Sequence, residues 1–305
     1  MSMRVHSRRL SLERRLAAAI VLAGGAAALE IVGSWLSGSL ALLSDAGHVG
    51  TDALALGLSL AALRASVRPH TPKHSFGFHR LEVLAALLNG LLLIGLAAYL
   101  IVTAYGRLPS PPLVEGGTMF VVGLSGLAAN ATMIVLLRDW AKTNINARGA
   151  FLHAYGDTLG SAGVVVGAAA IHLTGTAVLD VFITLFIVGL IVFSAVRLVR
   201  DGVHILLEAS PAGIRPRDVA DAILAVPGVK GVHDLHIWTV TSGLYALTGH
   251  LSVTGETTVD RASAIVALVE DRLLERFGIA HTTLQVDSLQ EEMISPADIA
   301  REPGV

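Results

Sequence analysis

Long apolar stretches separated by short polar connections fill the first two thirds of the chain. Each stretch has the roughly 20 residues that a helix needs to cross a bilayer. They cover residues 16–36, 39–63, 82–105, 116–137, 149–172 and 178–199. The first is longer than the apolar region of a cleavable signal peptide, so we expect it to be retained as a span. The pattern predicts a six-helix transmembrane domain over residues 16–200, preceded by a basic arm over residues 1–15.

After Arg200 the periodicity becomes that of a small soluble α+β domain. Helical spacing is expected from Pro216 to about residue 227 and again over residues 257–277. Strand-like alternation covers residues 229–240, 244–253 and 282–287. The order αββαβ predicts an open-faced sandwich with two helices on one side of a three-stranded sheet. We place this domain at residues 211–290, after a linker over residues 201–210 and before a polar tail over residues 291–305.

Composition supports a membrane protein and narrows the chemistry of any metal site. Hydrophobic residues make up 53% of the chain, charged residues 15%, and the mean hydropathy of +0.67 is too high for a soluble protein of this length. Nothing in the charge pattern suggests a nucleic-acid partner. The chain has no cysteine and 12 histidines, so a zinc site would use His, Asp or Glu ligands.

Lysine and arginine predict the orientation. They are concentrated in the N-terminal arm, in the connections after the second and fourth spans, and at the end of the sixth, whereas the opposite connections contain only Arg107. By the positive-inside rule both termini, and with them the soluble domain, are expected in the cytoplasm.

Two spans contain the same pair of polar residues. His48 and Asp52 lie in the second span as HVGTD, and His153 and Asp157 lie in the fifth as HAYGD. The i, i+4 spacing places both side chains of a pair on one helix face. If the two helices face each other, the four side chains form a His2Asp2 cage, a donor set that suits zinc.

The alternative is that each pair merely forms hydrogen bonds. That alternative is weak inside a membrane, where an ionisable side chain costs about 2.5–3.5 kcal/mol and usually marks a site or pathway. For Glu30, Asn89 and Asn130 we leave open whether they line an aqueous cavity or bond between helices. Asp45 is either an additional ligand or a carboxylate that orients His48.

Four motifs stand out along the chain: SDAGH at residues 44–48 leading to Asp52, FGFHRLE at residues 76–82, HAYGD with the following LGS, and HDLHIW at residues 233–238. Together they resemble the cation diffusion facilitator family, in its zinc-transporting branch. The resemblance extends over residues 15–290.

The resemblance implies a homodimer in the plasma membrane, or bacterial inner membrane, with a cytoplasmic ferredoxin-like domain. It implies efflux of divalent cations, most of all Zn2+ and also Cd2+ or Co2+, in exchange for protons by alternating access. The transport-site ligands map to His48, Asp52, His153 and Asp157. Zinc is then the cargo, the proton is the counter-ion, and no resident cofactor is implied.

Further metal sites are expected outside the membrane. The family's cytoplasmic sites map near His233, His250, Gln285 and Asp287, with His281 as an addition, although Gln is a poor zinc ligand and an ordinary polar sheet face is the alternative. Strand parity places His281, Gln285 and Asp287 on one polar face. The connection over residues 138–146 lacks the histidines that zinc transporters of the family often have there. His70 and His74, between spans two and three, form either a peripheral metal site or part of a solvated basic loop.

Two functions of other classes remain as rivals. A membrane metalloenzyme would need a general base or nucleophile, and none stands out; no HExxH motif occurs. A metal sensor would bind the ion without transporting it.

Overall fold

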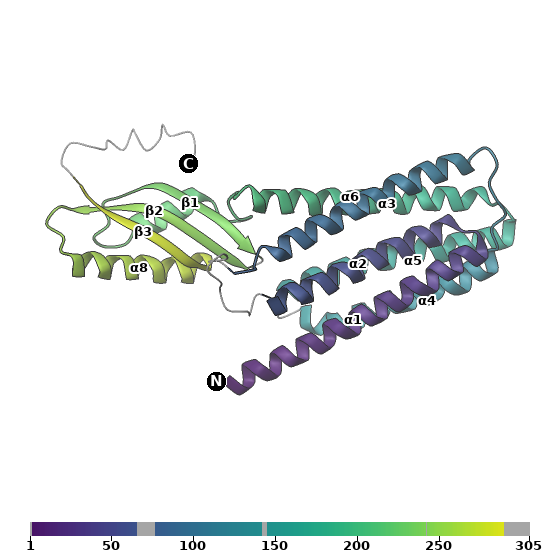
Figure 1. Ribbon diagram of the computed structural model, residues 1–305, viewed down its shortest axis with the longest axis horizontal. Helices are drawn as coiled ribbons and strands as arrows, with labels where there is room; N and C mark the ends of the chain where they lie inside the picture. The colour runs from purple at the N-terminus through teal and green to yellow at the C-terminus, as the bar shows by residue number, and fades with distance from the viewer. Residues whose placement is uncertain (1, 66–76, 142–144, 242, 290–305) are drawn as a thin grey trace. The chain divides into compact units, whose positions relative to one another are not determined.

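The computed structural model describes residues 2–65, 77–141, 145–241 and 243–289 (Figure 1). The chain forms two compact units whose boundary lies between Arg200 and Asp201. His70 and His74 lie outside the described residues.

The first unit consists of long helices that contain the predicted spans. They are α1 (Ser2–Ser37), α2 (Leu40–Ala65), α3 (Leu81–Arg107), α4 (Gly116–Ala141), α5 (Ile145–Thr174) and α6 (Val178–Leu206). Two helices extend past the apolar stretches. The backbone of the basic arm is helical from Ser2, and α6 continues beyond Arg200. Helical hydrogen bonding does not depend on the apolar pattern, so a helix can outlast its hydrophobic stretch.

Five helices within the described residues are long and apolar enough to cross a membrane: α1, α3, α4, α5 and α6. The remaining long helix, α2, carries Asp45, His48 and Asp52, which lower its hydropathy. The protein is therefore an integral membrane protein, and α2, the long helix outside this set of five, contains one of the two predicted ligand pairs.

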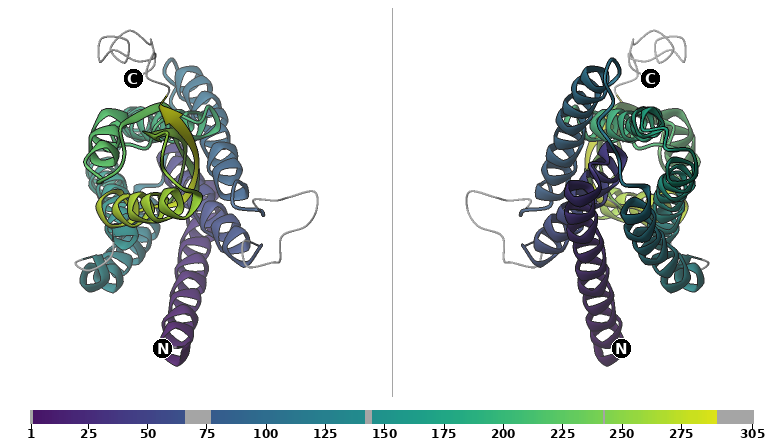
Figure 2. Two further views of the ribbon diagram at one scale, coloured as in Figure 1. Left: turned by 90° about the vertical axis from the view of Figure 1, so that its left-hand side faces the viewer. Right: turned by 90° about the vertical axis from the view of Figure 1, so that its right-hand side faces the viewer.

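Small residues allow the helices of this unit to approach closely. A Cβ added at Gly33 of α1 would lie 2.6 Å from Cγ1 of Val122 in α4, and one at Gly123 would lie 3.1 Å from Cγ1 of Val164 in α5. Helix α2 packs against α1, α3 and α5, and α4 packs against α5 (Figure 2). This packing brings α2 and α5 into contact, which the predicted cage requires.

The start of α2 is held by a buried carboxylate from α6. Asp180, which is 1% exposed, accepts hydrogen bonds from Ser39 Oγ at 2.6 Å and from the backbone N–H groups of Leu40 at 2.7 Å and Ala41 at 3.2 Å. Arg107 donates to the carbonyl of Gly38 at 2.8 Å and lies 3.8 Å from the same carboxylate. Ser39 caps α2 by accepting the N–H of Leu42 at 3.1 Å, and Asp180 satisfies the two N–H groups before it.

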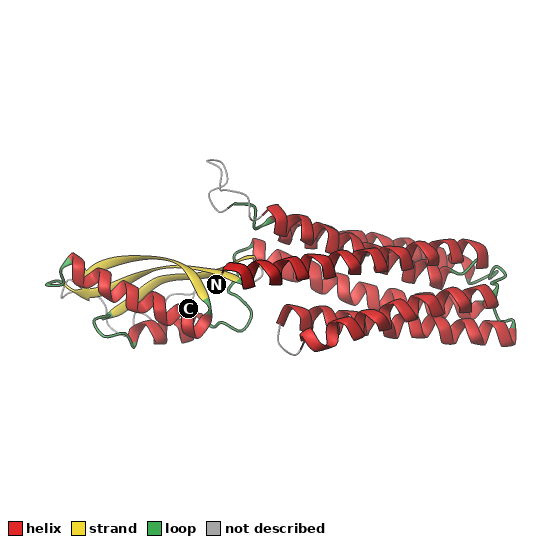
Figure 3. Ribbon diagram, turned by 90° about the horizontal axis from the view of Figure 1, so that it is seen from below, coloured by secondary structure: helices red, strands yellow, loops and turns green. Residues whose placement is uncertain are grey.

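The second unit has the element order α7 (Pro216–Leu224), β1 (Gly231–Thr241), β2 (Leu244–Thr254), α8 (Val259–Phe277) and β3 (Ile279–Leu289). The sheet order is β1-β2-β3, with β1 and β2 antiparallel and β2 and β3 parallel. Helix α8 makes the crossover between the parallel strands. Both helices cover the same face of the sheet (Figure 3).

The core of this unit is formed between the helices and that sheet face. Val219 of α7 and Val269 of α8 are fully buried against Leu247 and Leu251 of β2. Since side chains alternate along a strand, Thr248, His250 and Ser252 lie on the opposite face. The polar residues of the sheet therefore share the face that the helices leave open.

Candidate metal centres

The transmembrane centre combines side chains from α2 and α5. His48 Nε2 lies 3.2 Å from Asp157 Oδ1, and His48 Nδ1 lies 3.5 Å from Asp52 Oδ2. One ligand atom from each of these three residues lies within 4.8 Å of the others. An imidazole nitrogen and two carboxylate oxygens at this spacing can coordinate a single zinc ion.

The three side chains are only 13–16% exposed. His153 lies on α5 one turn before Asp157, and its side chain lies outside the described residues. The α2 half of the predicted cage and Asp157 of the α5 half thus come together.

A hydrogen-bonded network links three helices one turn from this centre. Ser161 Oγ donates to Asp45 Oδ2 at 2.7 Å and accepts from Asn130 Nδ2 at 3.0 Å. Asp45 is three residues before His48, and Ser161 is four residues after Asp157. Because these spacings are one helical turn, the network holds α2 and α5 together beside the ligands.

This network answers part of what the sequence left open. Asn130 bonds between helices, and Asp45 bonds to Ser161. Sequence inspection identified Asp45 and Asn130 as candidates. It noted Ser161 only as part of the LGS in a family motif and assigned it no contact.

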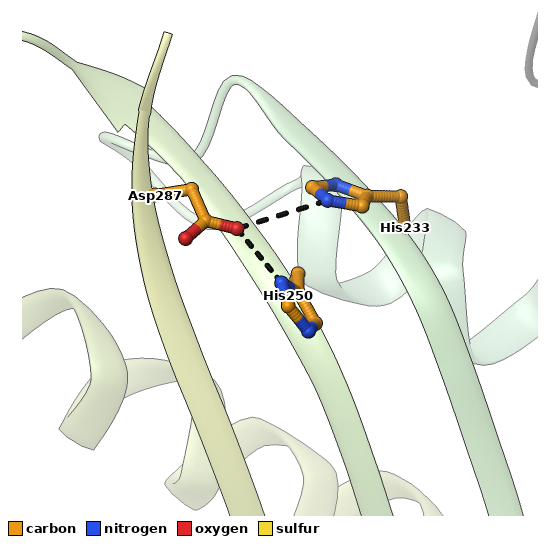
Figure 4. Close-up of side chains that lie close together, drawn as sticks. All are labelled: His233, His250 and Asp287. Carbon is orange, nitrogen blue, oxygen red and sulfur yellow. Dashed lines mark hydrogen bonds and ion pairs between the residues drawn. The ribbon is translucent and has the colours of Figure 1, made fainter.

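The second cluster lies on the open face of the sheet, with one residue from each strand. Asp287 Oδ2 lies 2.8 Å from His250 Nδ1 and 3.7 Å from His233 Nε2, and Figure 4 shows the three side chains turned toward one another. The register pairs His233 with His250, and Asp287 lies beside Ser252. Ligand atoms of the three residues lie within 4.8 Å of one another.

Hydrogen bonds stabilise the charged form of the carboxylate in this cluster. Gln285 Nε2 donates to Asp287 Oδ1 at 2.9 Å. This bond, followed by that from His250, holds the pKa of Asp287 below its ordinary value. A carboxylate that is ionised over the whole neutral range is ready to bind a cation without losing a proton.

Gln285 therefore supports the cluster through Asp287. His281 is on the same face of β3 but six residues away, which separates it from Asp287 by roughly 20 Å along the strand. The structure does not bring His281 to this cluster.

A β-bulge adds a residue that the sequence did not predict. Between His233 and His236, strand β1 has one more residue than β2, and Asp234 has a φ of 49°. The bulge returns His236 to the polar face. Asp234 then bonds to His236 Nε2 at 2.9 Å and lies 3.8 Å from His250 Nε2. A positive φ favours Asn and Asp among residues other than glycine, which is the only local signal for such a bulge.

Comparison with known proteins agrees with both units. Residues 16–207 match the family of cation efflux transmembrane domains, and residues 211–289 match the cytoplasmic domain of cation efflux proteins. The chain belongs to the cation diffusion facilitator family. Its second unit is accordingly a cytoplasmic domain with a small sheet.

Characterised relatives cover most of the chain. It is 40% identical to the metal cation efflux system protein CzcD of Cupriavidus metallidurans over 275 residues. This matched region covers 90% of this chain and 86% of CzcD. It is 36% identical over 262 residues to the cadmium, cobalt and zinc/H(+)-K(+) antiporter of Bacillus subtilis, covering 85% and 84%. It is 36% identical over 279 residues to the zinc transporter ZitB of Escherichia coli, covering 90% and 87%.

Among solved structures, the metal-bound C-terminal domain of the CzcD transporter is 38% identical to the matched part. It covers 24% of this chain and 99% of that one, with a TM-score of 0.22.

Proposed function

We propose that the protein exports divalent cations, above all Zn2+, from the cytoplasm in exchange for protons, and that Cd2+ and Co2+ are also transported. The relatives whose names give a function are efflux systems, antiporters and zinc transporters. We therefore favour a transporter over the two alternatives, a membrane metalloenzyme and a metal sensor.

The observation that carries the proposal is the convergence of His48, Asp52 and Asp157 inside a membrane domain. Buried ionisable groups are expensive in a bilayer, so a cluster contributed by two helices favours an ion pathway. We assign the transport site to these three residues together with His153. Zinc requires neutral His and ionised Asp, so the departing ion leaves groups that can accept protons.

The proposal includes the finer architecture. All six long helices cross the membrane, with α2 shielded by its neighbours and both termini in the cytoplasm, in agreement with the distribution of Lys and Arg. The cytoplasmic domain is ferredoxin-like, and the working unit is a homodimer in the plasma membrane. The match of residues 211–289 to the cytoplasmic domain of cation efflux proteins supports this arrangement.

A flux measurement tests the proposed function. Protein reconstituted into vesicles with an acidic interior is expected to take up Zn2+ while protons leave, because outward proton movement drives uptake by an antiporter. Zn2+, Cd2+, Co2+ and Mn2+ are compared in parallel with an internal metal dye and an internal pH dye. A protonophore with valinomycin, which removes the gradient, serves as the control. Zinc binding without uptake would identify a sensor and overturn the proposal.

We further propose that His233, His250 and Asp287 bind a regulatory zinc ion in the cytoplasmic domain. The two imidazoles and the carboxylate supply a donor set suited to zinc, and the strand register of β1 and β2 holds the imidazoles side by side, with ring centroids 5.0 Å apart. Asp234 lies near enough to His250 to orient it.

The pH dependence of this cluster follows from the low pKa of Asp287. Between pH 7 and 5 this carboxylate stays ionised, so falling affinity in that range comes from protons that compete with zinc for the imidazoles. In the Asp157→Ala background, which removes a transport-site ligand, calorimetry is expected to show zinc affinity that falls as the pH is lowered. Asp287→Asn is expected to weaken binding by at least about tenfold and leave the pH dependence unchanged. A pH dependence that disappears in Asp287→Asn would contradict this assignment.

A further inference from the structure

A second buried carboxylate lies outside the transmembrane cluster. Glu30 of α1 is 0% exposed, and neither of its carboxylate oxygens has a hydrogen-bond partner among the residues that the structure describes. A buried carboxylate without partners is costly, so its position calls for a ligand or a function.

Helices α2 and α4, which pack against α1, define the surroundings of this carboxylate. On α4, a Cβ at Gly126 would overlap Oε1 of Glu30, and the helix has no titratable side chain between Gly117 and Leu137. On α2, Asp45 is the charged group that acts on Glu30. Asp45 is itself 1% exposed, and its carboxylate interacts electrostatically with His48 and Asp157.

The two carboxylates lie closer to the α1–α2 turn than Asp52 of the metal cluster does. Helices α1 and α2 run antiparallel around the turn that joins them, with Ala27 against Gly50. Counting from that turn, Glu30 is roughly 10 Å along α1, close to the level of His48 at roughly 12 Å along α2. Asp45 is roughly 8 Å and Asp52 roughly 18 Å along α2. In the proposed orientation the turn is extracytoplasmic, so Glu30 lies toward the proton source.

Charge balance restricts what can accompany Glu30. Two buried carboxylates whose charges act on each other cannot both stay ionised in apolar surroundings without a compensating proton or cation. Asp45 is already engaged by Ser161, whereas the oxygens of Glu30 have no protein donor in the described part of the chain. A proton is the smallest ion that this closely packed position against Gly126 can accept.

We propose that Glu30 carries the counter-transported proton between the extracytoplasmic side and the metal cluster. The inference rests on the proposed proton-coupled efflux. A proton from the extracytoplasmic side binds the carboxylate and gives the neutral acid. When the ligands have released zinc, the proton leaves Glu30 toward them, and the carboxylate is regenerated. Zinc itself does not bind Glu30.

Glu30→Gln separates proton coupling from metal binding, because glutamine keeps the shape of the protonated acid but cannot release a proton. In vesicles of the full chain, uptake of Zn2+ driven by a pH gradient is expected to fall by at least about tenfold and to lose its dependence on external pH. Exchange of labelled for unlabelled Zn2+ without a gradient is expected to continue, since it needs only metal binding and alternation. Glu30→Asp is expected to restore part of the driven uptake and its pH profile.

Glu115→Gln is the matched control, because Glu115 is an exposed carboxylate in the connection before α4. It is expected to keep the driven uptake of the wild type. If Glu30→Gln keeps the wild-type rate and pH profile, the inference is overturned; it is also overturned if exchange and driven uptake are lost together, which would indicate a structural role. Failure of wild-type protein to transport zinc would instead overturn the proposed function.

Discussion

Replacement of Asp157 by alanine is expected to abolish zinc-driven proton flux while the protein still folds. Asp157 is the predicted α5 ligand whose side chain is described, and its Oδ1 lies 3.2 Å from Nε2 of His48 on α2. Without it, the described part of the cluster keeps only the two ligands of α2. We expect zinc affinity at the transport site to fall by at least about 100-fold, since even residues that only support metal ligands are worth 10- to 100-fold. Flux is measured in vesicles with a pH dye, and affinity by calorimetry.

Asp271→Ala provides the comparison for that experiment. Asp271 is an exposed aspartate on α8, which covers the face of the sheet opposite to the His233, His250 and Asp287 cluster, so the same substitution there is expected to leave flux unchanged. Size-exclusion chromatography establishes whether Asp157→Ala is folded. Normal flux in the folded Asp157→Ala protein would refute the assignment of the transport site.

The second large effect is expected at Asp180, where a substitution acts on stability. Asp180→Ala removes the acceptor for two backbone N–H groups of α2 and for the hydroxyl of Ser39. All three donors are buried, and Arg107 loses a nearby counter-charge. Leaving such groups unsatisfied costs about 2–5 kcal/mol.

For a domain of this size that loss corresponds to a melting temperature lower by roughly 5–15 °C. Thermal unfolding in detergent micelles measures the shift. Asp180→Asn keeps an acceptor oxygen and is expected to fall between the wild type and Asp180→Ala, and Asp271→Ala is again the control. A melting temperature within 1–2 °C of the wild type for Asp180→Ala would contradict this role of Asp180.

The contact of Asp180 with α2 also bears on transport. Helix α2 carries His48 and Asp52, and its first turn is bound to α6 through Asp180. The position of half of the metal cluster therefore depends on a residue 128 positions away from Asp52 in the sequence. Nothing in the apolar pattern of α6 indicates that its first acidic residue holds the start of another helix.

Local sequence patterns predicted much of the architecture because their causes are local. The order of α7, β1, β2, α8 and β3 agrees with the order read from periodicity, since turns and alternation are set by neighbouring residues. The parallel pairing of β2 and β3 and the extra residue at Asp234 were not predicted. Both depend on how distant segments meet.

The sequence by itself determined the two His-x-x-x-Asp pairs, because i, i+4 spacing on a helix places two side chains on one face and the cost of burying them in a bilayer marks a site. Only the tertiary structure decided that α2 and α5 meet, that Ser161 joins Asp45 to Asn130, and that Asp180 holds the start of α2. It also decided that Gln285 supports Asp287 while His281 lies apart on the same strand. Contacts between helices and between strands depend on the packing of residues far apart in the chain, which the spacing within one segment does not specify.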